Sequence, residues 1–98
     1  MSTTTLPLIE KETISKLSFP KGEVLQNAEM RHMRSATLQQ ANTLGNLDKQ
    51  KVLIHFVDSE GNKAVYTTIW AVTEAKVLLK AGMAIPIERI QQIKFVEP

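Results

Sequence analysis

The second half of the chain alternates between apolar runs and turn residues, a pattern typical of short antiparallel strands. We predict five strands, over residues 52–57, 63–72, 77–80, 83–87 and 93–96. Gly61 lies in the first connection and is free to adopt positive φ, as a hairpin turn needs. Pro86 has no backbone N–H to donate, so the fourth strand is expected at an edge of the sheet.

The first two strands predict which side chains form the core. If their hairpin closes symmetrically, Phe56 faces Val65, Ile54 faces Thr67 and Val52 faces Ile69. The opposite face is half apolar as well. A sheet that is apolar on both faces must be covered on both. We therefore expect the strands to curl into a barrel, with a helix covering part of the outer face.

Residues 21–44 show a helical period instead. Pro20 is tolerated at a helix start, and Gly45 is typical of a helix end. A thin apolar stripe recurs at steps of three and four residues and is expected to face the sheet. It consists of Met30, Met33, Thr37, Ala41 and Leu44. The predicted fold is thus α+β and mainly β: an N-terminal helix packed on a five-stranded, strongly bent antiparallel barrel.

The domain organisation follows from these elements. Residues 1–12 are rich in Thr and charge and show no sustained period, so they are predicted to be a flexible N-terminal arm. Residues 13–98 are predicted to form a single helix-plus-barrel domain. Ile14, Leu17 and Phe19 are candidates to dock on the barrel or to add a strand at its edge.

Composition narrows the chemistry. The 98 residues include 12 basic and 10 acidic side chains and no cysteine. Disulfides, thiolate metal sites and cysteine nucleophiles are therefore excluded. Charges of both signs are interspersed, which argues against a broad phosphate-binding face. The sequence lacks a signal peptide and an apolar run long enough to span a membrane, so we expect a cytoplasmic protein.

The order of a helix and five strands resembles the Sm-like barrels, including the Sm and Hfq families. The similarity covers about half the chain and includes Val77-Leu78-Leu79-Lys80 followed by a Gly turn. Src-homology-3-like barrels share this architecture, and small uncharacterised bacterial proteins share the layout. The eukaryotic Sm signature is absent between Ile69 and Leu79. The resemblance implies self-association through the last strands, and it aligns Arg89 with the turn by which Hfq reads RNA.

No residue pattern indicates catalysis, a cofactor or a metal. Glu29 and His32 share a helical face, but a closed metal site needs three or four protein ligands. His55 is expected mid-strand opposite Tyr66, with no partner for proton transfer. Asp58 and Glu60 flank a turn, where an Asp side chain commonly bonds the backbone.

Five residues are candidates for a partner or nucleic-acid surface: Arg31, Arg34, Tyr66, Trp70 and Arg89. Exposed, the two aromatic rings would form a platform for stacking bases. We expect instead that the helix covers them, because large aromatic side chains dominate cores and interfaces. The predicted function is a non-enzymatic binding or assembly module that engages a protein partner or a second copy. The alternative is a protein that binds RNA or single-stranded DNA.

Overall fold

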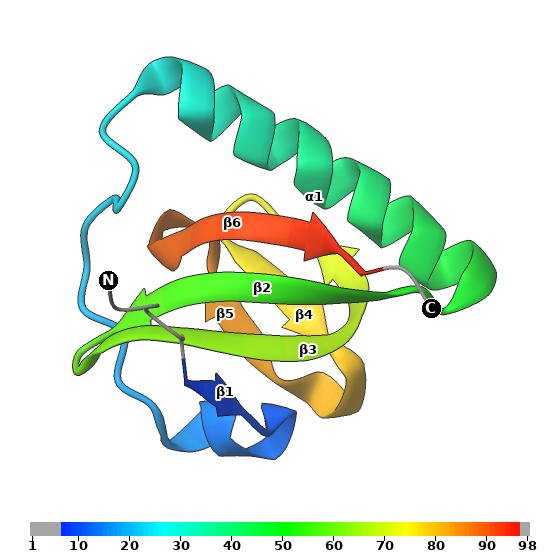
Figure 1. The fold of residues 1–98 in the computed structure, drawn as a ribbon, viewed down its shortest axis with the longest axis horizontal. Coiled ribbons are helices and arrows are strands. Elements are labelled where there is room, and N and C mark those ends of the chain that lie inside the picture. The colour runs from blue at the N-terminus through cyan, green and yellow to red at the C-terminus, as the bar shows by residue number, and fades with distance from the viewer. Residues whose placement is uncertain (1–6, 97–98) are drawn as a thin grey trace, which may run out of the picture.

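The computed structural model describes residues 7–96, which form one long helix and six strands (Figure 1). In chain order these are β1 (Leu8–Ile9), α1 (Ala28–Asp48), β2 (Lys51–Asp58), β3 (Gly61–Val72), β4 (Lys76–Leu79), β5 (Ala84–Pro86) and β6 (Ile90–Phe95). Three 3-10 helices connect them: η1 (Lys11–Lys16), η2 (Lys80–Gly82) and η3 (Ile87–Arg89). The predicted α+β class is confirmed.

The sheet has the strand order β5-β4-β3-β2-β6, with antiparallel neighbours throughout. No pairing among the described strands joins β5 to β6, so the sheet stays open and the predicted closed barrel is wrong. The physical reason lies in the helix. Helix α1 packs against β3 and β6 and buries Leu38 and Ala41 in the core. The apolar interior is therefore covered by a helix rather than by closure of the strands.

The β2–β3 hairpin is tighter than predicted. Asp58 pairs with Gly61 across a two-residue turn, which places Ile54 opposite Val65 and Val52 opposite Thr67. This register differs by two residues from the symmetric closure. A shift of two leaves every side chain on its predicted face, because strands alternate with a period of two. The predicted core face is accordingly confirmed. Its members are all buried: Val52, Ile54, Phe56, Val65, Thr67 and Ile69.

Helix α1 begins and ends later than predicted. Asn27 caps it by accepting hydrogen bonds from the backbone N–H groups of Glu29 and Met30. At the other end Lys49, with φ of 56°, adopts the left-handed conformation, so the helix ends there and not at Gly45 as predicted. Gly45 instead lies inside the helix, where α1 approaches β3 so closely that a Cβ atom would lie 2.4 Å from the carbonyl oxygen of Ile69.

The helix also presents a different face to the sheet. Its buried residues are Arg34, Leu38, Ala41 and Gly45. The predicted stripe is confirmed at Ala41, while Thr37 and Leu44 are half-buried. It is wrong at Met30 and Met33, which are exposed. Sequence periodicity counts a charged residue as solvent-facing. Here Arg34 is accepted into the interior because its charge is paired, as described below.

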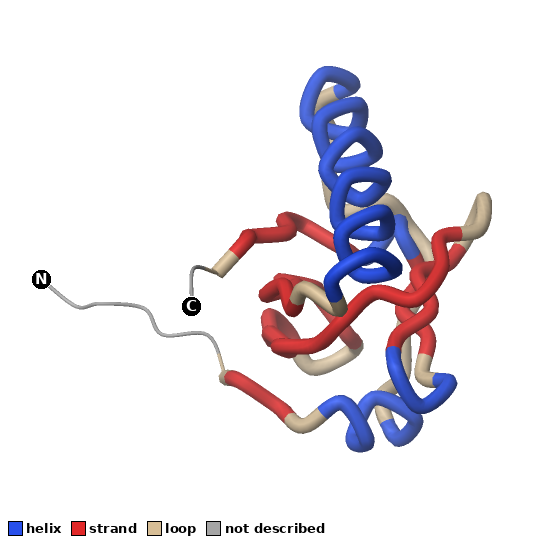
Figure 2. The backbone as a smooth tube through the Cα atoms, turned by 90° about the vertical axis from the view of Figure 1, so that its right-hand side faces the viewer, coloured by secondary structure: helices blue, strands red, loops and turns tan. Residues whose placement is uncertain are grey.

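The N-terminal segment lies on the side of the sheet opposite α1 (Figure 2). Of the predicted arm over residues 1–12, residues 1–6 lie outside the described part of the chain. Strand β1 follows and pairs in parallel with Ala64 and Val65 of β3. Ile14 of η1 is buried, and the ring of Phe19 lies 5.8 Å from that of Phe56. At the far side of the sheet, Pro86 lies in the edge strand β5, as predicted.

Candidate binding surface

Two aromatic side chains of β3 are exposed on the face that points away from the core. Trp70 keeps 55% of its surface exposed and Tyr66 keeps 43%. The expectation that the helix covers them is wrong. The end of α1 covers only Thr68 between them, whose hydroxyl donates to the carbonyl of Lys49. The two rings therefore flank the helix end and remain open to solvent.

Three lysines surround these rings. The Nζ atom of Lys51 lies 5.5 Å from the centre of the Tyr66 ring, a cation–π geometry. Lys49 and Lys80 line a hollow of about 230 Å³ beside Trp70, together with Gly45, Asn46 and Thr68. We call Tyr66, Trp70, Lys49, Lys51 and Lys80 the aromatic–basic surface.

Sequence reasoning identified the two aromatic residues and missed Lys49 and Lys80. Lys49 follows the helix, and Lys80 follows β4, so they are distant from Trp70 in the sequence. Only the packing of the helix end on β3 and the pairing of β3 with β4 bring them together. No local pattern indicates Lys49 in the sequence, because Gly45 resembles a helix stop and the helix continues past it to Asp48.

The predicted arginines belong to a different part of the molecule. Arg34 is 8% exposed, and its two terminal nitrogens donate to both carboxylate oxygens of Glu23 at 2.7 and 2.6 Å. It also donates to the carbonyl of Ile90 at 2.9 Å. The pKa of Glu23 lies below its usual range, and the largest cause is the hydrogen bonding from Arg34. Arg34 and Glu23 therefore form a structural ion pair, and Arg34 is not available to a phosphate backbone.

Arg31 and Arg89 likewise hold the segment that precedes the helix. Arg31 donates to the carbonyl of Leu25 at 2.9 Å. Arg89 donates to the carbonyls of Val57, at 3.0 Å, and Gly22, at 2.9 Å. We call residues 20–27 the strap. The three arginines tie it to the helix and the sheet, and none of them lines the hollow beside Trp70.

The remaining candidates have structural roles. Asp58 accepts hydrogen bonds from the backbone N–H groups of Glu60, at 2.8 Å, and Gly61, at 3.1 Å, which confirms the predicted turn chemistry. His55 lies opposite Ala64, not Tyr66. Burial, reinforced by Lys94, lowers the pKa of His55. Among residues 7–96, no three His, Asp or Glu side chains are grouped so as to hold a metal ion.

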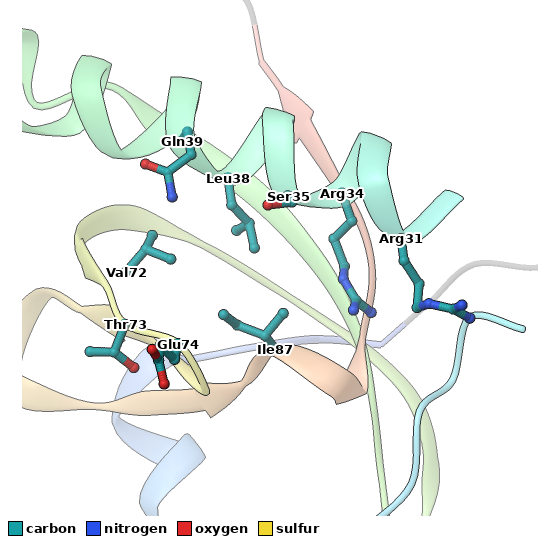
Figure 3. A pocket seen from close by; sticks show the side chains of 9 residues that line it. All are labelled: Arg31, Arg34, Ser35, Leu38, Gln39, Val72, Thr73, Glu74 and Ile87. Carbon is teal, nitrogen blue, oxygen red and sulfur yellow. The ribbon is translucent and has the colours of Figure 1, made fainter. Parts of the chain in front are cut away.

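A second, larger hollow of about 490 Å³ lies between α1 and the connection from β3 to β4 (Figure 3). We call it the helix–loop hollow. It is lined by Arg31, Arg34, Ser35, Leu38, Gln39, Val72, Thr73, Glu74 and Ile87. It shares no lining residue with the hollow beside Trp70.

Comparison with known proteins identifies no relative: no family model, no curated protein and no solved structure matches the chain. Within the described residues, none of the helices combines the length and apolar character that crossing a membrane requires. Functional conclusions must therefore come from the surfaces themselves.

Proposed function

We propose that this protein is a non-enzymatic binding module that holds single-stranded nucleic acid, RNA or DNA, on its aromatic–basic surface. The observation that carries the proposal is the exposure of Trp70 beside Lys49 and Lys80. An exposed ring next to cations offers a base a stacking partner and its phosphates a counter-charge.

The spacing of the two rings sets the size of the ligand. Tyr66 and Trp70 are four residues apart on one strand, which separates them by about 13 Å at about 3.3 Å per residue. A single nucleotide cannot reach both rings, so the ligand is an oligonucleotide. Each stacked base contributes about 1–3 kcal/mol. Three lysines predict a slope of log K against log salt of about −2 for a single strand.

The test uses labelled oligothymidylate, with affinity measured by fluorescence anisotropy at several salt concentrations. We expect Trp70→Ala to weaken binding by about 5- to 150-fold and Trp70→Phe to retain most of it, because a phenyl ring still stacks. Lys80→Ala should reduce the salt slope by about 0.7. Lys76→Ala is the matched control, since Lys76 is an exposed lysine that does not line the hollow beside Trp70.

Two outcomes would contradict this proposal. One is the absence of binding at low salt by oligothymidylate and oligouridylate. The other is binding that Trp70→Ala leaves unchanged. Because Trp70 is the only tryptophan of the chain, quenching of its intrinsic fluorescence by unlabelled oligonucleotide gives an independent readout at the site itself.

A second candidate function, assembly with another copy of the chain, is supported by the two ends of the sheet. Among the described strands, β5 pairs only with β4, and β6 pairs only with β2. Unpaired edges favour pairing with another chain. Phe95, the last residue of β6, and Val96 after it are exposed and apolar. The resemblance to Sm-like barrels stays a proposal, supported by the chain order of a helix and five strands with η3 between the last two.

Sedimentation velocity over a wide range of concentration tests this second function. We expect a reversible increase in mass that Gln92→Pro abolishes, because proline in β6 obstructs strand addition. Gln91→Lys and Phe95→Ser serve as milder variants of the same strand. A strict monomer at high concentration would contradict assembly and leave the nucleic-acid proposal intact.

A further inference from the structure

The helix–loop hollow carries charge of opposite sign at its two ends (Figure 3). Arg31 and Arg34 lie at one end, and Glu74 lies at the other, on the connection from β3 to β4. Leu38 and Ile87 lie between them. The walls thus present a cationic end, an apolar middle and an anionic end in sequence. A side-chain ion pair across the hollow is absent from the described residues, since Arg34 pairs with Glu23 and not with Glu74.

One buried polar atom of a residue that lines this hollow has no hydrogen-bond partner. The Nε atom of Arg34 is the one buried side-chain nitrogen or oxygen in the described part of the chain without a partner. A buried donor left unsatisfied costs free energy and calls for an explanation. Ser35, Gln39 and Glu74 line the same hollow and are exposed to solvent, so their polar groups are accessible to a ligand.

These features select a class of ligand. An apolar ligand would cover Arg34 and Glu74 without pairing them, which is unfavourable. A phosphate or another anion would be repelled by Glu74, and a simple cation by Arg31. A molecule with a carboxylate at one end and an ammonium group at the other matches both ends. Guanidinium groups bind carboxylates well because their donors are planar and fixed.

We propose that the helix–loop hollow binds a short zwitterionic molecule with an apolar body, of which a dipeptide of aliphatic residues is the type. Its carboxylate accepts from the guanidinium of Arg31, next to Arg34, whose terminal nitrogens Glu23 already occupies. Its ammonium group pairs with Glu74. Its aliphatic side chains lie on Leu38, Val72 and Ile87. The volume of about 490 Å³ falls within the range of small-molecule pockets.

The experiment is a titration of the full chain with L-leucyl-L-leucine, followed by amide chemical shifts in NMR and by calorimetry. We expect saturable shifts at Ser35, Val72 and Thr73. Acetylation of the ligand's amino group should weaken binding by about fivefold in the unmodified protein and leave it unchanged in Glu74→Gln. Amidation of the ligand's carboxylate should weaken binding similarly in the unmodified protein and have no further effect in Arg31→Gln.

Two controls separate this site from other effects. Glu60→Gln removes an exposed glutamate at the β2–β3 turn and should not alter dipeptide binding. Arg31→Lys keeps the charge and should retain part of the affinity for the dipeptide. This variant distinguishes a loss of affinity in Arg31→Gln from unfolding of the protein. The proposal is overturned if the dipeptide causes no saturable shifts, or if blocking its termini has the same effect in the variants as in the unmodified protein. Trp70→Ala should leave dipeptide binding unchanged.

Discussion

Glu23→Gln is expected to lower the free energy of unfolding by about 2–4 kcal/mol. Removing one partner of a buried ion pair costs about 3–5 kcal/mol, because the other charge is left buried and unpaired. Glu23 keeps 29% of its side chain exposed, which places the expected value slightly below that range. The glutamine retains the shape of the side chain, so the effect measures the charge and not a cavity.

The cost is high because Arg34 has few other partners. Without the carboxylate, its guanidinium keeps the hydrogen bond to the carbonyl of Ile90, and its Nε atom already lacks an acceptor. Glu23 also accepts from the backbone N–H of Leu25 at 3.0 Å. A glutamine has one acceptor oxygen in place of two, so the variant should loosen the strap as well. We expect the backbone amides of residues 22–25 to exchange faster with solvent in the variant.

The same pair predicts acid lability. Arg34 lowers the pKa of Glu23 in the folded state. Burial opposes the shift at Asp58, but hydrogen bonds from Lys63 and from the Glu60 and Gly61 amides outweigh it and lower that pKa too. A lowered folded pKa stabilises the protein above the ordinary pKa, near 4, and the stabilisation is lost as the pH falls through the folded value. Stability should therefore drop below about pH 4.5, and less steeply in Glu23→Gln.

Urea denaturation at a series of pH values measures both effects. Glu12→Gln is the matched control, because Glu12 pairs with Lys11 at the surface, where ion pairs contribute at most about 1 kcal/mol. If Glu23→Gln and Glu12→Gln were equally stable, Arg34 would not depend on its partner, and the role assigned to this pair would be wrong.

The sequence predicts correctly those features of the fold that depend on neighbouring residues, and it fails where a feature depends on residues far apart in the chain. Alternation along β2 and β3 identifies the core face correctly, because the period of two is local and survives a shift of the hairpin by two residues. The prediction of the helix face is wrong only near the start of the helix, because that part depends on a partner 11 residues away: Glu23 makes Arg34 an interior residue. Met30 and Met33, which are more apolar, remain outside.

The candidate surface shows the same limit. Tyr66 and Trp70 share a strand face, which the period of two reveals directly. Whether that face is covered depends on where the helix crosses the sheet, and the crossing is fixed at Gly45. Arg31, Arg34 and Arg89 resemble nucleic-acid contacts in the sequence, but their acceptors are carbonyls and a carboxylate of the same chain. Positive charge alone did not distinguish a binding residue from a structural one.

Gly45→Ala is expected to destabilise the protein by about 1–3 kcal/mol, although the same change at an exposed helix position would stabilise a helix by about 1 kcal/mol. The new Cβ atom would lie 2.4 Å from the carbonyl oxygen of Ile69 and 3.2 Å from a methyl group of Thr68. The first of these is a backbone atom in the middle of the sheet and cannot rotate away. The helix must therefore move, and Gly45→Val should cost more.

Thermal and urea denaturation measure the stability of Gly45→Ala. Thr43→Ala is the control. Thr43 is exposed on the same helix, so its replacement tests helix propensity without a contact to the sheet. A stabilised Gly45→Ala would show that the helix does not approach β3 so closely.

The displacement of the helix in Gly45→Ala should also reach the surface beside Trp70, because Gly45, Asn46 and Lys49 line that hollow. Gly45→Ala should then weaken oligonucleotide binding under conditions where the protein is still folded, although residue 45 carries neither a charge nor an aromatic ring.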